Sequence, residues 1–229
     1  MEIGLEVHLS REIVNLKKRI LSMGALVEDS IQKALRSLQL RDPELAQQVI
    51  SADEDIDAIE VEVEEDCLKI LALYQPVAHD LRFVVACLKI NNDLERIADQ
   101  AANIAERAKF LANHLDVQYP HELTEMVREV QNMLKICLDS FVNGSETQAL
   151  SVISRDDFID NLHRQMYVLM QERMKADLNN LECYVNLLSV SRQLERVADQ
   201  VTNIAEDVVY LVRGSIVRHQ GTDSNGNRT

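Results

Sequence analysis

The sequence predicts an all-α protein made of two tandem three-helix bundles, six helices in all, related by internal duplication. Three observations lead to this fold class. The 229 residues include only 6 Gly, 3 Pro and 4% aromatic side chains, so turn formers and the residues that strands favour are scarce, while 46% are hydrophobic. Apolar residues recur at intervals of three and four, as on one face of a helix. A segment of the first half also recurs in the second half.

The first half contains three predicted helices. The first has an apolar face made of Leu9, Ile13, Leu16, Ile20, Met23 and Val27. Asp42 and Pro43 then supply a helix cap and a first-turn proline, so the second helix begins there. It runs to about Tyr74, with the apolar residues Leu45, Val49, Ala52, Ile56, Ile59 and Val63. Pro76 breaks the chain, and the third helix follows with Ile90, Leu94, Ile97, Ala101, Ile104, Ala108 and Leu111.

The second half begins after the apolar pattern stops around Tyr119-Pro120. Leu123 to Phe141 is predicted to be helical, and Asn143-Gly144 marks the end of that helix. Thr147 to about Lys175 forms the next predicted helix. The last one runs from about Leu181 to Arg213, with an apolar face of Leu187, Val190, Leu194, Val197, Val201, Ile204, Val208 and Leu211.

The duplication is visible in the third and sixth predicted helices. Residues 93–106 and 193–206 are identical at 10 of 14 positions without a gap. The second and fifth predicted helices also correspond, because Asp53, Ile56 and Asp57 match Asp156, Ile159 and Asp160. We therefore expect one three-helix repeat over residues 1–115, a second over 116–214 and a flexible tail over 215–229.

The charge and the cysteines exclude several classes of function. A net charge of −14 and a pI near 4.8 would repel a polyanion, so we expect no nucleic-acid partner. Cysteines 67, 87, 137 and 183 lie far apart, which favours reduced packing residues over a zinc site or a disulfide framework. No signal-peptide or membrane-spanning pattern is found, and we expect a cytoplasmic protein.

Two quartets of polar residues form the most distinctive pattern. At 100° per residue, each quartet spans a helix face of only about 80°: Glu95, Asp99, Asn103 and Glu106 in one repeat, Glu195, Asp199, Asn203 and Glu206 in the other. A solvated surface is one interpretation. However, like charges four residues apart destabilise a helix by roughly 0.2–0.5 kcal/mol per pair, and no Lys or Arg belongs to either quartet. A bound cation would compensate for this repulsion.

The second and fifth predicted helices supply matching acidic residues. These are Asp53, Asp57, Glu60 and Glu64 in the first repeat, and Asp156, Asp160 and His163 in the second. If neighbouring helices pack side by side, the acidic residues converge on a site of hard oxygen ligands suited to Mg, Mn or Fe, and His163 would add a nitrogen. Taken alone, a histidine such as His163 is more often a surface residue than a metal ligand. The pattern does not distinguish among Fe, Mn, Mg and Zn.

An enzymatic function has little support in the sequence. Four-helix di-iron enzymes carry Glu-x-x-His pairs on two helices, and the nearest match here is Asp160-x-x-His163. No Gly-rich phosphate loop and no nucleophile motif is present. We therefore predict no catalytic residues. A carboxylate-bridged metalloenzyme and a metal-free helical scaffold remain the alternatives to a metal-binding protein without enzymatic activity.

Three motifs resemble those of the PhoU family of phosphate-uptake regulators. They are the paired segments Leu94-Glu-Arg-Ile-Ala-Asp99 and Leu194-Glu-Arg-Val-Ala-Asp199, the segment Tyr74-Gln-Pro-Val-Ala-His-Asp-Leu-Arg82, and Tyr210-Leu-Val-Arg-Gly214. The resemblance extends from about Leu9 to His219. It implies two tandem three-helix bundles with multinuclear metal clusters, iron in some members. The ligands it implies are Asp53, Asp57, Glu95 and Asp99, with Asp156, Asp160, Glu195 and Asp199 in the second repeat.

The resemblance also implies a function. Members of this family are negative regulators of phosphate uptake that are thought to connect a phosphate ABC transporter with the sensor histidine kinase of the phosphate-starvation response. We expect a homodimer that meets the membrane only through such partners. Arg82 is a predicted partner contact, with a surface salt bridge worth about 0–1 kcal/mol as the alternative. The second repeat lacks this motif, because Asn180-Leu-Glu182 stands in place of Asp80-Leu-Arg82.

Overall fold

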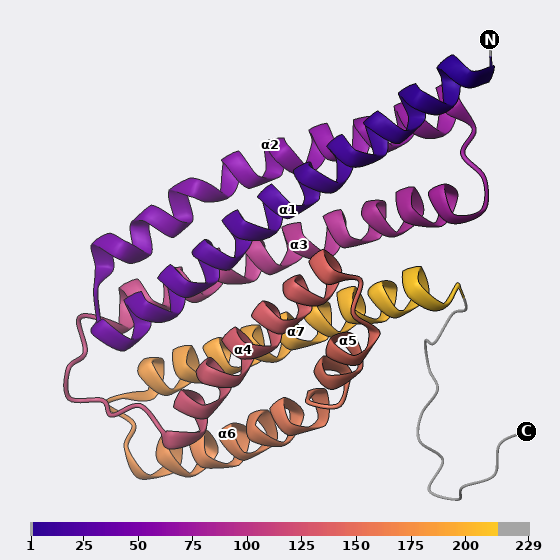
Figure 1. Cartoon of the computed structure of the whole chain (residues 1–229). Helices are drawn as coiled ribbons and strands as arrows, with labels where there is room; N and C mark the ends of the chain where they lie inside the picture. The colour runs from indigo at the N-terminus through magenta and orange to yellow at the C-terminus, as the bar shows by residue number, and fades with distance from the viewer. Residues whose placement is uncertain (1, 215–229) are drawn as a thin grey trace, which may run out of the picture.

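The computed structural model describes the backbone of residues 2–214 and the side chains of residues 7–214; the predicted tail, residues 215–229, lies outside this range. The fold class is confirmed. The first bundle consists of α1 (Glu2–Leu40), α2 (Pro43–Tyr74) and α3 (Ala78–Leu111) (Figure 1). The second consists of α4 (His121–Asn143), α5 (Glu146–Ile153), α6 (Asp156–Ala176) and α7 (Leu181–Arg213).

The predicted helix from Thr147 to Lys175 is broken, which gives the second bundle its short helix α5. At the break, the N–H of Arg155 donates to the carbonyl of Val152 at 2.9 Å, three residues back rather than four. The Ser154 hydroxyl also donates to a backbone carbonyl of its own turn. The Arg155 guanidinium bonds Glu129 of α4, so a contact between helices accompanies the break.

The helix ends follow the local sequence signals. Asp42 Oδ1 accepts from the N–H groups of Glu44 and Leu45 at 3.0 Å each, which caps α2. Gly144 ends α4 with φ 60°, a left-handed conformation that glycine adopts without strain. The turn around Pro76 is less usual, because Gln75 and Ala78 have φ values of 44° and 47°.

The two bundles meet along α3 and α7, which lie side by side in the middle of the molecule and run in opposite directions (Figure 1). α3 packs as extensively against α7 as against α1 of its own bundle. Lys89 of α3 donates to Asp207 of α7 at 3.2 Å. α1 and α4 also approach closely, since a Cβ on Gly24 would lie 3.0 Å from Leu138 Cδ2. One continuous apolar core therefore joins the two repeats.

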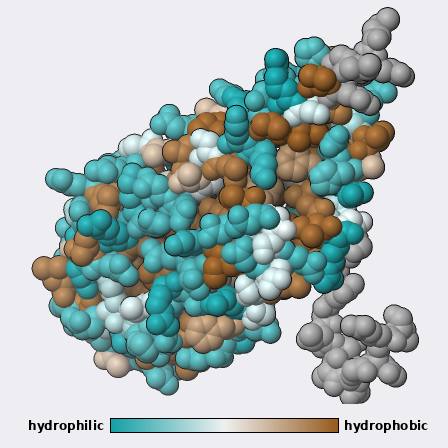
Figure 2. Space-filling model, in the orientation of Figure 1, coloured by the Kyte–Doolittle hydropathy of each residue, from teal (hydrophilic) through white to brown (hydrophobic). Residues whose placement is uncertain are grey.

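The cysteines belong to the apolar core. All four cysteines are buried and free, as predicted for packing residues. Within residues 2–214, no helix is both long and apolar enough to cross a membrane. Figure 2 shows a largely hydrophilic face on which hydrophobic residues gather toward the end where α1 begins. The division into separate domains at residues 115 and 116 stays a prediction.

Candidate metal centre

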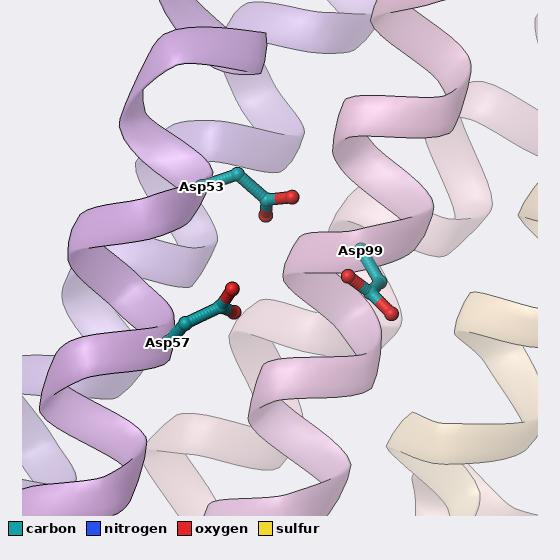
Figure 3. A group of neighbouring side chains, drawn as sticks. All are labelled: Asp53, Asp57 and Asp99. Carbon is teal, nitrogen blue, oxygen red and sulfur yellow. The ribbon is translucent and has the colours of Figure 1, made fainter.

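Three carboxylates from two helices converge in the first bundle. Asp53 and Asp57 lie one turn apart on α2, and Asp99 lies on α3 beside them (Figure 3). One oxygen of each side chain lies within 4.8 Å of the other two. Carboxylate oxygens are the ligands that hard cations such as Mg and Mn prefer. The residues present therefore fit a metal ion held between α2 and α3.

The packing of the two helices explains why these side chains meet. Ile56, next to Asp57, is 3% exposed, and Ala98, next to Asp99, is 2% exposed. Adjacent residues on a helix point about 100° apart. The aspartates therefore lie at the edge of the buried face along which α2 and α3 pack, and they reach across the seam toward one another.

The convergence has an electrostatic cost. Burial raises the pKa of Asp53 to about 6, and the charges of Asp99 and Asp57 add to the effect. Burial also raises the pKa of Asp99, with a further contribution from Asp57. Each shift means that the environment disfavours the ionised carboxylate. A cation bound among the three oxygens would relieve that penalty.

Glu95 belongs to the same electrostatic cluster. Burial raises the pKa of Glu95, and the charges of Asp99, Asp57 and Glu60 raise it further. Arg96 acts in the opposite direction. Neither quartet contains a basic residue. Arg96, which directly follows Glu95 in the sequence, nevertheless offsets part of the repulsion among the carboxylates. The sequence already carries this signal as a Glu-Arg pair in both repeats.

The second repeat shows a related cluster between α6 and α7. Burial raises the pKa of Asp199 to about 6, and the charges of Glu195, Asp156 and Asp160 contribute, while Arg196 opposes them. The four carboxylates of this cluster are the ligands that the family resemblance implied for the second repeat. Among the residues whose side chains are described, however, only Asp53, Asp57 and Asp99 bring three ligand atoms within 4.8 Å of one another.

A hydroxyl distinguishes the second cluster from the first. Thr202 Oγ1 donates to Asp156 Oδ1 at 3.3 Å. The position equivalent to Thr202 in the first repeat is Ala102, which has no such donor. Burial nevertheless raises the pKa of Asp156, because the hydrogen bond opposes the effect only in part. Thr202 was not among the predicted site residues, although its replacement of Ala102 is one of the four differences between the repeated segments.

His163 turns toward the neighbouring helix. Its Nδ1 lies 2.7 Å from the hydroxyl of Ser191 on α7. The equivalent pair in the first repeat is Glu60 and Asn91, and there the Asn91 amide donates to the Glu60 backbone carbonyl at 2.8 Å. His163 thus occupies the place of Glu60, one turn beyond Asp160. Its role as a metal ligand stays a prediction.

Asn103 and Glu106 lie farther along α3 and make contacts of their own. Asn103 Nδ2 donates to the backbone carbonyl of Asp99 at 2.7 Å. Glu106 is exposed, and its carboxylate lies 3.9 Å from the Arg107 guanidinium. The structure therefore does not place these two side chains in the group formed by the three aspartates.

Asn203 and Glu206 face the other repeat. Both line a groove of about 580 Å³ between α7 and the first bundle, where Lys89 and Arg96 also lie.

Arg82, the predicted partner contact, lies near the start of α3. Its guanidinium carbon would be 3.6 Å from a Cβ on Gly214, so Arg82 lies against the end of α7.

Comparison with known proteins gives consistent matches over most of the chain. A family model described as the PhoU domain matches residues 20–108 and again 123–208. A phosphate-specific transport system accessory protein PhoU homolog of Aquifex aeolicus is 37% identical over 218 residues, covering 95% of this chain and 99% of that protein. The corresponding accessory protein PhoU of Serratia marcescens is 32% identical over 226 residues, covering 97% and 93%.

Solved structures match in the same way. The crystal structure of PhoU from Pseudomonas aeruginosa superposes with a TM-score of 0.86 at 35% identity, covering 90% of this chain and 99% of that one. The phosphate transport system regulatory protein PhoU from Streptococcus pneumoniae gives a TM-score of 0.82 at 31% identity, covering 91% and 99%. The similarity thus includes both bundles.

Proposed function

Because the chain belongs to the PhoU family, we propose that it is a negative regulator of phosphate uptake and of the phosphate-starvation response. Its relatives are named accessory proteins of phosphate transport rather than enzymes, which supports a role in regulating that transport. In this proposal it acts as a metal-dependent adaptor between a phosphate ABC transporter and a sensor histidine kinase. It works as a cytoplasmic homodimer and meets the membrane only through these partners.

The observation that carries the metal part of the proposal is the convergence of Asp53, Asp57 and Asp99. A cation there would join α2 to α3, and one in the second cluster would join α6 to α7. Oxygen ligands alone favour Mg, Mn or ferric iron, whereas a nitrogen from His163 would also suit Zn. Bound metal would thereby neutralise part of the negative charge on the faces that the adaptor presents.

Arg82 is the proposed contact with a protein partner. Arg82 Nε is buried, and no hydrogen-bond acceptor for it lies among the described residues. The second repeat carries Glu182 at the equivalent position, at the exposed start of α7. The two repeats would therefore present different surfaces to transporter and kinase.

The test of the regulatory proposal is a reporter for phosphate-starvation genes in cells grown with abundant phosphate. Deletion of this chain is expected to derepress the reporter, and the parent chain should restore repression. A variant with Asp57→Asn and Asp99→Asn should restore it poorly. Asp55→Asn, an exposed change on the same helix, serves as the matched control. Unchanged reporter expression after deletion would refute the inhibitory role.

Elemental analysis of the purified chain separates the adaptor from its alternatives. A metal-free scaffold predicts no stoichiometric metal in the parent protein. A carboxylate-bridged metalloenzyme predicts metal together with turnover of an oxidisable or phosphorylated substrate. The adaptor predicts metal without turnover.

A further inference from the structure

A basic pocket lies where the ends of several helices meet, away from both acidic clusters. Its volume is about 380 Å³, and it is lined by Lys17 of α1, by His79 and Arg82 near the start of α3, and by residues at the ends of α4 and α7. In a chain of net charge −14, three basic side chains around one cavity and no carboxylate in its lining are notable. The local charge favours an anionic ligand.

Arg82 is the central group of this pocket. Its Nε is buried and has no hydrogen-bond partner among the residues whose side chains are described. Burying an unpaired polar atom destabilises the folded state, because the atom loses its hydrogen bonds to water and gains none in return. Arg82 also makes no ion pair within those residues. An anion in the pocket would supply the missing acceptor.

Lys17 adds a second donor from another helix. Its Nζ donates to the carbonyl of Val142 in the last turn of α4, at 3.3 Å. That bond uses one of the three protons of the ammonium group, so others remain for a ligand. Helix C-termini attract cations on their own account, so capping is the competing explanation for the basic side chains.

Apolar groups complete the lining. The rings of Phe83 and Phe141 stack with their centroids 6.3 Å apart and their planes 14° apart. Leu211 and Val212 line the pocket from α7. Pockets for small organic ligands usually have about 300–1,000 Å³ and mostly apolar walls with a few polar groups that fix orientation. A lone inorganic anion would leave these walls without a partner.

We propose that this pocket binds a small organic phosphate of the nucleotide class. In this proposal the phosphoryl group contacts Arg82, Lys17 and His79, and the apolar part of the ligand packs against the wall that includes Phe83. An arginine fork matches phosphoryl oxygens in two parallel hydrogen bonds, which a helix-capping role does not require. This site goes beyond the proposed adaptor function. It also gives Arg82 a role that needs no protein partner.

The experiment is calorimetric titration of the full-length protein with AMP, in the presence of a chelator that keeps metal out of the acidic sites. Orthophosphate and adenosine are titrated separately to divide the phosphoryl contribution from that of the base. Arg82→Gln and Lys17→Gln are each expected to weaken AMP binding at least tenfold, equivalent to about 1.4 kcal/mol. Arg36→Gln, the same charge change at an exposed site on α1, should leave binding unchanged.

His79→Gln provides a variant at an exposed position, in case Arg82→Gln does not fold, and it should also weaken binding. The proposal is overturned if the parent shows no saturable AMP binding, or if Arg36→Gln weakens it as much as Lys17→Gln does. Orthophosphate binding as tightly as AMP would overturn the organic part of the ligand. Because the titration uses metal-free protein outside the cell, failure of the adaptor proposal would not affect its outcome.

Discussion

At the scale of single residues, Asp53 and Asp199 have the most clearly perturbed carboxylates. The pKa of each is raised to about 6, first by burial and then by neighbouring carboxylates. A raised pKa means that the folded state binds the proton more tightly than the unfolded chain does. The resulting stabilisation is complete below the ordinary aspartate pKa and is lost as the pH rises through about 6.

The metal-free protein is therefore expected to melt at a higher temperature at about pH 5.5 than at about pH 7.5. Asp53→Asn should raise its stability at about pH 7.5 by about 1 kcal/mol, a value reduced because the group is only partly buried. The same change should flatten the pH dependence. Thermal melts with chelator across this range measure both effects. Asp55→Asn is the control, and an equal shift in that variant would count against a site-specific cause.

Arg82 and Glu182 are equivalent positions with opposite charges. Arg82→Glu is expected to impair repression of a phosphate-starvation reporter far more than Glu182→Arg, because only Arg82 lines the basic pocket and lacks a protein partner for its buried nitrogen among the described residues. Both variants should keep the parent's far-UV circular dichroism. Equal impairment by the two substitutions would remove the proposed asymmetry between the repeats.

At the scale of helices, each acidic cluster combines one helix of the α2 or α6 type with one of the α3 or α7 type. Asp99 and Glu95 lie one turn apart on α3, and Glu195 and Asp199 repeat this on α7. Only the first cluster brings three oxygens together among the described residues, whereas the second has Thr202 bound to Asp156. The two repeats therefore share the same acidic positions but differ in the contacts that these side chains make.

Metal counts should follow this division into helix pairs. Changing Glu95 and Asp99 to Ala is expected to remove the first site, and changing Glu195 and Asp199 to Ala the second. Each double variant should lose roughly half of the bound metal if the repeats are independent. Added Mn or Fe should raise the melting temperature of the parent, since a hundredfold excess over Kd adds about 2.7 kcal/mol of stability. Mass spectrometry and thermal melts provide the measurements.

The metal-free melts of these variants give a second criterion. Removing the carboxylates also removes their repulsion, so without metal each double variant should melt no lower than the parent. Loss of a structural ion-pair network would instead lower the melting temperature. A parent that binds no divalent or ferric metal would show that the acidic faces are only solvated.

At the scale of the whole molecule, α3 and α7 bind the two repeats into one body. α3 packs against α7 as closely as against α1 of its own bundle, and the continuous core includes residues from both halves. The pair Lys89 and Asp207 lies on this seam, where the aspartate is 2% exposed. Neither repeat keeps its core covered without the other.

The metal-free chain is accordingly expected to unfold in a single cooperative transition. Unfolding one repeat would expose the apolar faces of α3 or α7, so a half-folded species should not accumulate. Differential scanning calorimetry tests this through equality of the calorimetric and van't Hoff enthalpies. Two resolved peaks would instead indicate that the repeats are independent folding units, as the division at residues 115 and 116 would allow.

The sequence alone determined the features that repeat along one helix. Apolar residues at intervals of three and four, the Asp42 cap and the Gly144 terminus depend on local geometry, so the helices and their duplication were predictable. The acidic faces were predictable for the same reason. The break near Ser154 was not foreseen, and it is accompanied by a contact between Arg155 and Glu129 on another helix.

Only the tertiary structure decided which polar side chains come together. The four members of each quartet share one helix face. Even so, Asp99 of the first quartet meets Asp53 and Asp57, whereas Asn203 of the second quartet lines a groove toward the other repeat. The basic pocket likewise takes its lining from four helices. Such groupings depend on the axial register and rotation of packed helices, which the periodicity of a single helix does not specify.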